Sequence, residues 1–88
     1  MRYNSGVQIK AEMREEVLNR LRRIEGQVRG VQKLVEQGAD CEKVAGQVKA
    51  ARTALDAAGK LILACYLTES LASEKISERD AINLIVKF

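Results

Sequence analysis

Residues 17–35 read VLNRLRRIEGQVRGVQKLV, and the spacing of their apolar residues decides the fold. These residues recur in steps of four and three, at Val17, Leu21, Ile24, Val28, Val31 and Val35. Such steps place side chains along one stripe of an α-helix, the heptad pattern of helices that pack against other helices. Gly38 and Asp40 then favour the end of one helix and the start of another. We therefore predict a helix that begins between residues 7 and 10 and ends near Gln37.

The same spacing returns after a short link. From about Cys41 to Leu71 the apolar stripe consists of Val44, Val48, Ala51, Leu55, Ala58, Ile62 and Cys65. A link of a few residues makes the two long helices antiparallel neighbours. A short third helix is predicted from Ser77, because Ser77 and Asp80 fit the start of a capping box. The expected fold class is all-α, with a three-helix protomer of two long antiparallel helices and a short C-terminal helix.

The chain is short for the number of apolar residues that it carries. Its 88 residues are 47% hydrophobic but only 3% aromatic and include no proline, which suits helix-on-helix packing in one domain. We expect a flexible arm at residues 1–9 and a single helical domain at residues 10–88. Two helices cannot bury both stripes together with the additional Leu34, Leu61, Leu63 and Leu67. This surplus predicts that two hairpins pair into a four-helix-bundle dimer.

Composition also bears on the compartment and the chemistry. The sequence has no run of 18 apolar residues and no secretion signal, so we expect a cytoplasmic protein without a membrane partner. The two cysteines, Cys41 and Cys65, should remain thiols in a reducing compartment. Histidine is absent, which removes the commonest ligand of transition metals.

Basic residues are concentrated on the first predicted helix. Those between residues 14 and 33 are Arg14, Arg20, Arg22, Arg23, Arg29 and Lys33, and the second helix adds Lys49, Arg52 and Lys60. One interpretation is a solvated face in which Glu25 and Arg29 form an i,i+4 pair. The other is a surface that follows DNA phosphates, whose binding weakens as salt rises. On the second interpretation, Lys49 is a candidate DNA contact.

One motif is specific enough to indicate a family. The segment NRLRRIEGQVRGV at residues 19–31 resembles the CsoR/RcnR family of bacterial repressors, as does a later stretch that contains Gln47, Val48, Ala50, Arg52, Ala54 and Leu55. The resemblance covers about residues 14–71. It implies a disc-shaped homotetramer made of two dimers, which releases double-stranded operator DNA when an effector occupies cysteine-containing sites between protomers. It also implies DNA contacts at Arg20, Arg23 and Arg52.

The positions of the family's effector ligands differ in this chain. Copper(I)-sensing members are similar in having a Cys equivalent to Cys41, followed by a His and a second Cys at positions that here hold Tyr66 and Ser70. A phenol and a hydroxyl are weak ligands for a soft ion such as Cu(I). Nickel- and cobalt-sensing members need several imidazoles, which this chain lacks. Persulfide-sensing members resemble a two-thiol pattern whose second thiol would also stand at Ser70.

Three residues are candidate effector-sensing positions: Cys41, Cys65 and Tyr66. Cys41 is predicted in the first turn of a helix, where thiols are often reactive. Cys65 is either a small core residue of the apolar stripe or a thiol that faces Cys41 of another protomer.

The leading hypothesis is a repressor released by persulfide, polysulfide or another electrophile at Cys41. The alternative effector is Cu(I), the one candidate cofactor, held by Cys41 and Cys65 alone. Aldehyde-sensing relatives pair the equivalent cysteine with the chain's N-terminus, and the arm keeps that chemistry open.

Two alternatives belong to other classes. Helical chorismate mutases are also small, Arg-rich, all-α dimers, but they need several charged residues inside the bundle, and here only Arg14 lies near the apolar stripe. A plain helical assembly protein would show no salt-sensitive binding to DNA. The sequence therefore favours a non-enzymatic DNA-binding repressor that pairs with itself as a homodimer or homotetramer.

Overall fold

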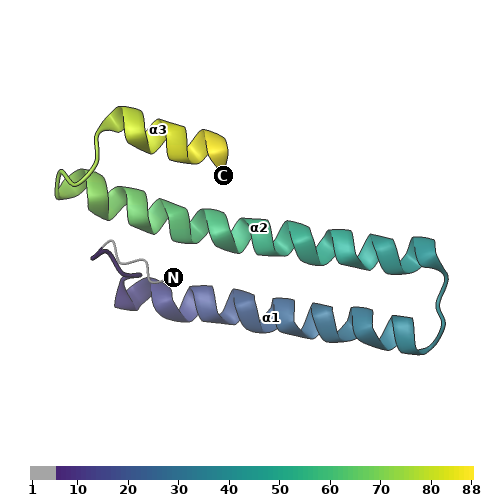
Figure 1. Ribbon diagram of the computed structural model, residues 1–88. Helices are drawn as coiled ribbons and strands as arrows, with labels where there is room; N and C mark the ends of the chain where they lie inside the picture. The colour runs from purple at the N-terminus through teal and green to yellow at the C-terminus, as the bar shows by residue number, and fades with distance from the viewer. Residues whose placement is uncertain (1–5) are drawn as a thin grey trace.

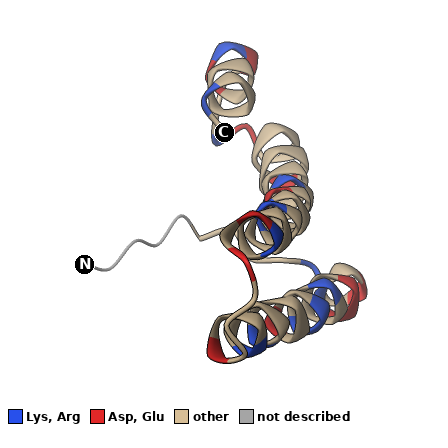
Figure 2. Ribbon diagram, turned by 90° about the vertical axis from the view of Figure 1, so that its right-hand side faces the viewer, with Lys and Arg blue, Asp and Glu red and all other residues tan. Residues whose placement is uncertain are grey.

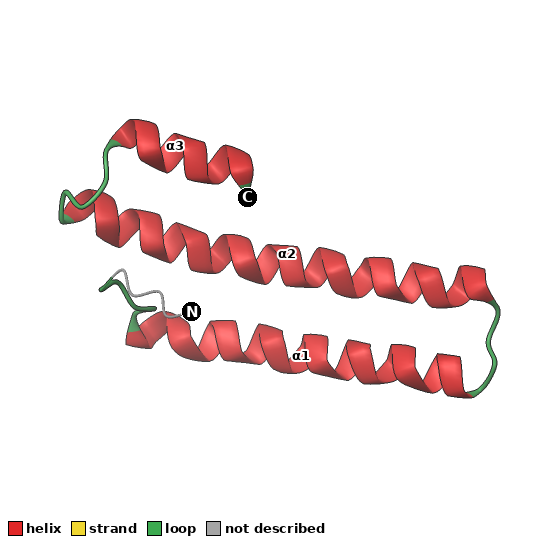
Figure 3. Ribbon diagram, viewed as in Figure 1, coloured by secondary structure: helices red, strands yellow, loops and turns green. Residues whose placement is uncertain are grey.

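The computed structural model describes residues 6–88, which contain three helices (Figures 1 and 3). Helix α1 spans Ala11–Glu36, α2 spans Cys41–Ala72 and α3 spans Glu78–Lys87. The predicted all-α protomer, with two long antiparallel helices and a short C-terminal helix, is confirmed. Residues 1–5, the first part of the expected arm, lie outside the described residues.

Side chains and a glycine set the helix ends where the sequence indicates. Helix α2 begins after Asp40, whose Oδ1 accepts the backbone N–H of Lys43 at 2.9 Å. Helix α3 begins in the same way after Ser77, whose Oγ accepts the backbone N–H of Asp80 at 3.1 Å. Gly38 follows α1 with φ of +73°, a left-handed conformation that glycine adopts without strain. These caps explain why the predicted and observed boundaries agree closely.

Helix α2 lies between the other two helices. Figure 1 shows α1 and α2 side by side as an antiparallel hairpin with α3 on the far side of α2, and Figure 2 shows the same order from the end of the hairpin. Helix α3 packs on α2 and not on α1. The molecule is elongated, with extents of 52 × 26 × 24 Å. None of the helices within residues 6–88 is both long enough and apolar enough to pass through a membrane.

The two heptad stripes are divided between the inside and the outside of the hairpin. Alternate stripe positions face the neighbouring helix and are buried or half-buried, namely Val17, Ile24, Val31, Val44, Ala51, Ala58 and Cys65. The positions between them are less covered, and four of these side chains are 47–61% exposed: Val28, Val35, Val48 and Leu55. In each stripe, the inward-facing residues therefore pack inside the hairpin, and the residues between them form a second apolar surface that has no partner in the protomer.

That second surface forms one continuous side of the hairpin, which we call the apolar flank. It consists of Leu21, Val28 and Val35 on α1 and Val48, Leu55 and Ile62 on α2. Each of these residues follows an inward-facing residue by one helical turn, which rotates it about 40° to one side. Because the helices are antiparallel, this rotation leads to the same side of both helices.

Helix α3 leaves most of its apolar side chains uncovered. Ala81 is buried, whereas Ile82, Ile85 and Val86 are exposed. The ring of Phe88 rests on Gly59 of α2, where any side chain would collide with it. The glycine thus permits a close approach that holds the end of α3 on α2.

Candidate DNA-binding groove and sensing cysteines

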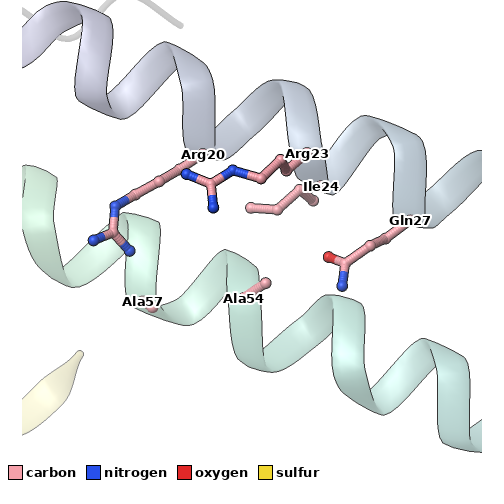
Figure 4. Close-up of a pocket in the computed structure, with 6 residues that line it drawn as sticks. All are labelled: Arg20, Arg23, Ile24, Gln27, Ala54 and Ala57. Atoms are coloured by element: carbon pink, nitrogen blue, oxygen red, sulfur yellow. The ribbon is translucent and has the colours of Figure 1, made fainter.

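A recessed groove runs between α1 and α2, on the side of the hairpin away from the apolar flank (Figure 4). We call it the basic groove; it has a volume of about 400 Å³ and is lined by Arg20, Arg23, Ile24, Gln27, Ala54 and Ala57. The three polar residues recur at three- and four-residue intervals, so they share one side of α1. Helix α2 meets them with alanines, which leave room for the groove.

The polar side chains of the groove have few partners of their own. Arg20 Nε lies 3.8 Å from Glu16 Oε2 in a half-exposed ion pair and has no hydrogen-bond acceptor. Within residues 6–88, Arg23 forms no ion pair and the side chain of Gln27 forms no hydrogen bond. Figure 4 shows all three side chains extending from α1 over the groove. Two guanidinium groups and an amide above an apolar floor are suited to an anion such as a DNA phosphate.

The other two predicted DNA contacts lie elsewhere on the hairpin. Arg52 and Lys49 are exposed on α2. Arg52 precedes Ala54 by two residues, which turns its side chain about 160° away from the groove. One protomer therefore brings Arg20 and Arg23 together, but does not bring Arg52 or Lys49 to them.

Cys41 is exposed at the tip of the hairpin, as the first residue of α2. It lines a shallow, apolar hollow together with Val35, Ala39, Val44 and Ala45. Since Val35 belongs to the apolar flank, the thiol lies at the end of that flank. A chemical change at Cys41 would thus occur beside the uncovered apolar flank.

Cys65 lies towards the other end of α2 and is half-buried. The segment of residues 7–9 covers it and encloses a cavity of about 40 Å³, whose other lining residues are Ile62, Cys65 and Tyr66. At the end of this segment, Lys10 Nζ lies 3.5 Å from Glu69 Oε2 in a half-exposed ion pair. The sequence did not predict that the arm covers a candidate sensing residue.

The two thiols cannot meet within one chain. Helix α2 is continuous, so Cys41 and Cys65 are about 36 Å apart along it and point about 120° apart around it. Tyr66 and Ser70 instead follow Cys41 by nearly whole numbers of turns, so each points within about 20° of the direction of Cys41 around α2. Ser70 is fully buried, and its hydroxyl has no hydrogen-bond partner. The side of α2 that carries Cys41 therefore offers hydroxyl groups and no second thiol.

Comparison with models of known protein families identifies the family of this chain. The model of the metal-sensitive transcriptional repressor family matches residues 13–88. The chain belongs to this family. Its members are transcriptional repressors and not enzymes, so the expected resemblance and the expectation of a non-enzymatic protein are both confirmed, and the chorismate mutase and plain assembly alternatives are set aside.

Two individual proteins that are similar to this chain also support its membership in the family. The chain is 43% identical over 42 residues to the copper-sensing transcriptional repressor CsoR of Bacillus subtilis (strain 168). That match covers 48% of this chain and 42% of the relative, less than half of its length. The fold is similar to the crystal structure of the copper-sensing repressor CsoR with Cu(I) from Geobacillus thermodenitrificans NG80-2, with a TM-score of 0.72 and 32% identity. This second match covers 93% of this chain and 92% of the other.

The residues of this repressor do not fit a Cu(I) site within the protomer. On the side of α2 that carries Cys41, Tyr66 and Ser70 offer a phenol and a buried hydroxyl, whereas Cu(I) prefers soft thiolate ligands. Cys65 lies on a different side and beneath residues 7–9. Across residues 6–88, no three His, Cys, Asp or Glu side chains lie close enough together to hold a metal ion. The chemistry available beside Cys41 is that of a single thiol.

The two thiols of the repressor should react at different rates. With limiting iodoacetamide, we expect Cys41 to be alkylated on the order of tenfold faster, because Cys65 reacts when residues 7–9 open locally. Peptide mass spectrometry over a time course measures both rates. Lys10→Ala removes the ion pair with Glu69 and should speed alkylation of Cys65 while leaving Cys41 unchanged. Equal rates for the two thiols in the wild type would contradict this prediction.

Proposed function

We propose that this chain is an effector-responsive repressor that holds operator DNA in the basic groove and leaves it when Cys41 is modified. The observation that carries the proposal is the position of Cys41, an exposed thiol at the end of the apolar flank with no second thiol on its side of α2. The effectors that suit such a thiol are persulfides, polysulfides and other electrophiles such as aldehydes.

With inorganic polysulfide, the chemistry is an exchange between a thiol and a sulfur–sulfur bond. The Cys41 thiol loses its proton to solvent, and the thiolate attacks a terminal sulfur of the polysulfide. One sulfur–sulfur bond of the polysulfide breaks, and a polysulfide that is shorter by one sulfur leaves with the electron pair. Cys41 becomes a persulfide, and the polysulfide itself is the oxidant.

We infer that two copies of the chain pair through the apolar flank. Four side chains of this surface remain 47–61% exposed in the protomer, and contiguous apolar surface of this kind marks an interaction site. Two hairpins joined in this way form a four-helix bundle. The exposed apolar residues of α3, which include Ile82, Ile85 and Val86, supply a further surface for joining two dimers into a homotetramer.

Modification of Cys41 would act on DNA binding through this pairing. The thiol shares its hollow with Val35 and Val44, so a persulfide anion places charge at the edge of an apolar contact. If the hairpins shift relative to one another, the spacing between the basic grooves of the two protomers changes. The affinity for DNA then depends on the state of Cys41, which is the coupling that defines an allosteric repressor.

Cu(I) is the second candidate effector, and the names of the copper-sensing relatives favour it. It would need Cys65 of another protomer as a second thiolate beside Cys41. The 120° rotation of Cys65 away from the side of Cys41, together with its cover of residues 7–9, argues against that pairing. Polysulfide chemistry needs Cys41 alone.

Fluorescence anisotropy with a duplex from upstream of the gene tests the proposal. The wild type should bind, with an affinity that falls steeply as salt rises. Arg23→Ala should weaken binding and reduce the magnitude of the salt slope by about one, because one phosphate contact is lost. Polysulfide should dissociate the wild-type complex, with formaldehyde and Cu(I) added in parallel samples.

Lys33→Ala is the matched control. Lys33 is exposed and lies about 180° around α1 from the inward-facing Ile24, so its side chain is away from both the basic groove and the apolar flank. Replacing Lys33 removes one positive charge from α1 and should change the affinity for DNA less than replacing Arg23. Equal losses would show that the charge of α1, and not the basic groove, governs binding. If the wild type does not bind the duplex even at low salt, the proposed function is wrong.

A further inference from the structure

The floor of the basic groove is made by two alanines of α2. Ala54 and Ala57 face the side chains that α1 extends over the groove (Figure 4). Arg20, Arg23 and Gln27 lie along about 10 Å of α1, since each residue adds 1.5 Å. A rod of negative charge can therefore lie in the recess and meet all three side chains. Larger residues on α2 would fill the same space.

Gln27 is the neutral member of this group. Its amide carries two N–H donors, and within residues 6–88 it has no hydrogen-bond partner. Figure 4 shows the amide over the groove on the same side as the two guanidinium groups. An amide donor can bind a phosphate oxygen without changing the number of counterions that DNA releases, because it carries no charge.

The width of the hairpin decides which part of DNA can reach the groove. The major groove of B-DNA is about 12 Å wide and admits a single helix. The basic groove lies between two packed helices, each about 10 Å in diameter, and the hairpin is therefore too wide to enter. The base edges stay out of reach of residues in the recess, whereas the phosphate backbone stands at the surface of the duplex.

We propose that the basic groove holds a stretch of DNA sugar–phosphate backbone, that Gln27 is a third contact to it beside Arg20 and Arg23, and that no base is read there. This inference rests on the proposed function and adds the part of the DNA that this site binds. Sequence preference must then arise from other residues or from the shape of the operator.

Two pairs of variants test the inference, with anisotropy on the operator duplex and on an unrelated duplex. Gln27→Ala should weaken binding to both about tenfold, because a hydrogen bond to a charged oxygen is lost, and should leave the salt slope unchanged. Ala57→Leu should also weaken binding to both, because it fills the recess without removing a charge. Gln27 and Ala57 are both exposed, and circular dichroism checks that the variants keep their helices.

The controls are Gln32→Ala and Ala50→Leu. Gln32 lies on a different side of α1, and Ala50 lies two turns before Ala57 on the same side of α2, outside the groove. Neither control should change affinity more than twofold, roughly the scatter for surface substitutions. A loss by Gln27→Ala that is confined to the operator would show that Gln27 reads a base and would overturn the inference. So would unchanged binding by both Gln27→Ala and Ala57→Leu when Arg23→Ala still lowers the salt slope. No binding by the wild type would overturn the proposed function as well.

Discussion

Replacing Cys41 with serine will yield a repressor that remains on its operator when polysulfide is added. Serine keeps the size of the side chain but cannot form a persulfide, so the exchange at the tip of the hairpin is lost. The variant should bind DNA as tightly as the wild type before treatment, because Cys41 is exposed and does not line the basic groove. Anisotropy of the operator complex during a polysulfide titration measures this effect. The wild-type protein should dissociate from the DNA, whereas the Cys41→Ser variant should not dissociate at all.

Cys65→Ser is the control for this experiment. Cys65 lies beneath residues 7–9 and on a different side of α2, so this variant should still leave the operator on treatment. Mass spectrometry of the treated wild type should find one added sulfur on the peptide that contains Cys41. If Cys41→Ser still leaves the DNA, or if Cys65→Ser fails to do so, Cys41 is not the sole sensing thiol.

Leu55→Asp should abolish assembly and, with it, operator binding. Leu55 lies in the middle of the apolar flank, and its side chain is 52% exposed in the protomer. A carboxylate buried without a partner in a contact costs several kcal/mol, and a twofold dimer buries two of them. We expect the dimer dissociation constant to rise more than about a hundredfold. Analytical ultracentrifugation at micromolar concentration measures the mass, and anisotropy measures the loss of DNA binding.

Thr53→Asp introduces the same charge two residues away. Thr53 is exposed on the outer side of α2, where its hydroxyl bonds to the backbone oxygen of Lys49. This variant should keep the mass of the wild-type assembly. A Leu55→Asp protein with wild-type mass would show that the apolar flank is not the contact between copies, and so would a monomeric wild type.

The course of the chain follows from local chemistry that the sequence displays. Asp40 and Ser77 form the caps expected of them, and Gly38 adopts the left-handed conformation that closes α1. Cys41 begins α2, as the position of Asp40 requires. These features depend on residues within a few positions of one another, which is why they can be predicted without tertiary information.

Features that depend on distant parts of the chain were not predictable in the same way. The heptad stripe gives the period of the apolar residues but not the side to which each one turns, so it did not separate buried Ile24 from exposed Val28. The cover of residues 7–9 over Cys65 joins segments far apart in the sequence. The position of Gln27 over a groove depends on two alanines of α2 that lie opposite it. In each case the deciding contact lies across the hairpin.

Helix α2 contributes residues to three separate features of the molecule. It carries Cys41 at one end, the alanines of the basic groove in its middle, and Gly59, on which the ring of Phe88 packs. Because α2 is a single unbroken helix, we expect a rotation that starts at Cys41 to move Ala54 and Ala57 under Arg20 and Arg23, and Gly59 under Phe88, together. On the proposed function, release of DNA and a change in the contact between α2 and α3 would then occur as one event.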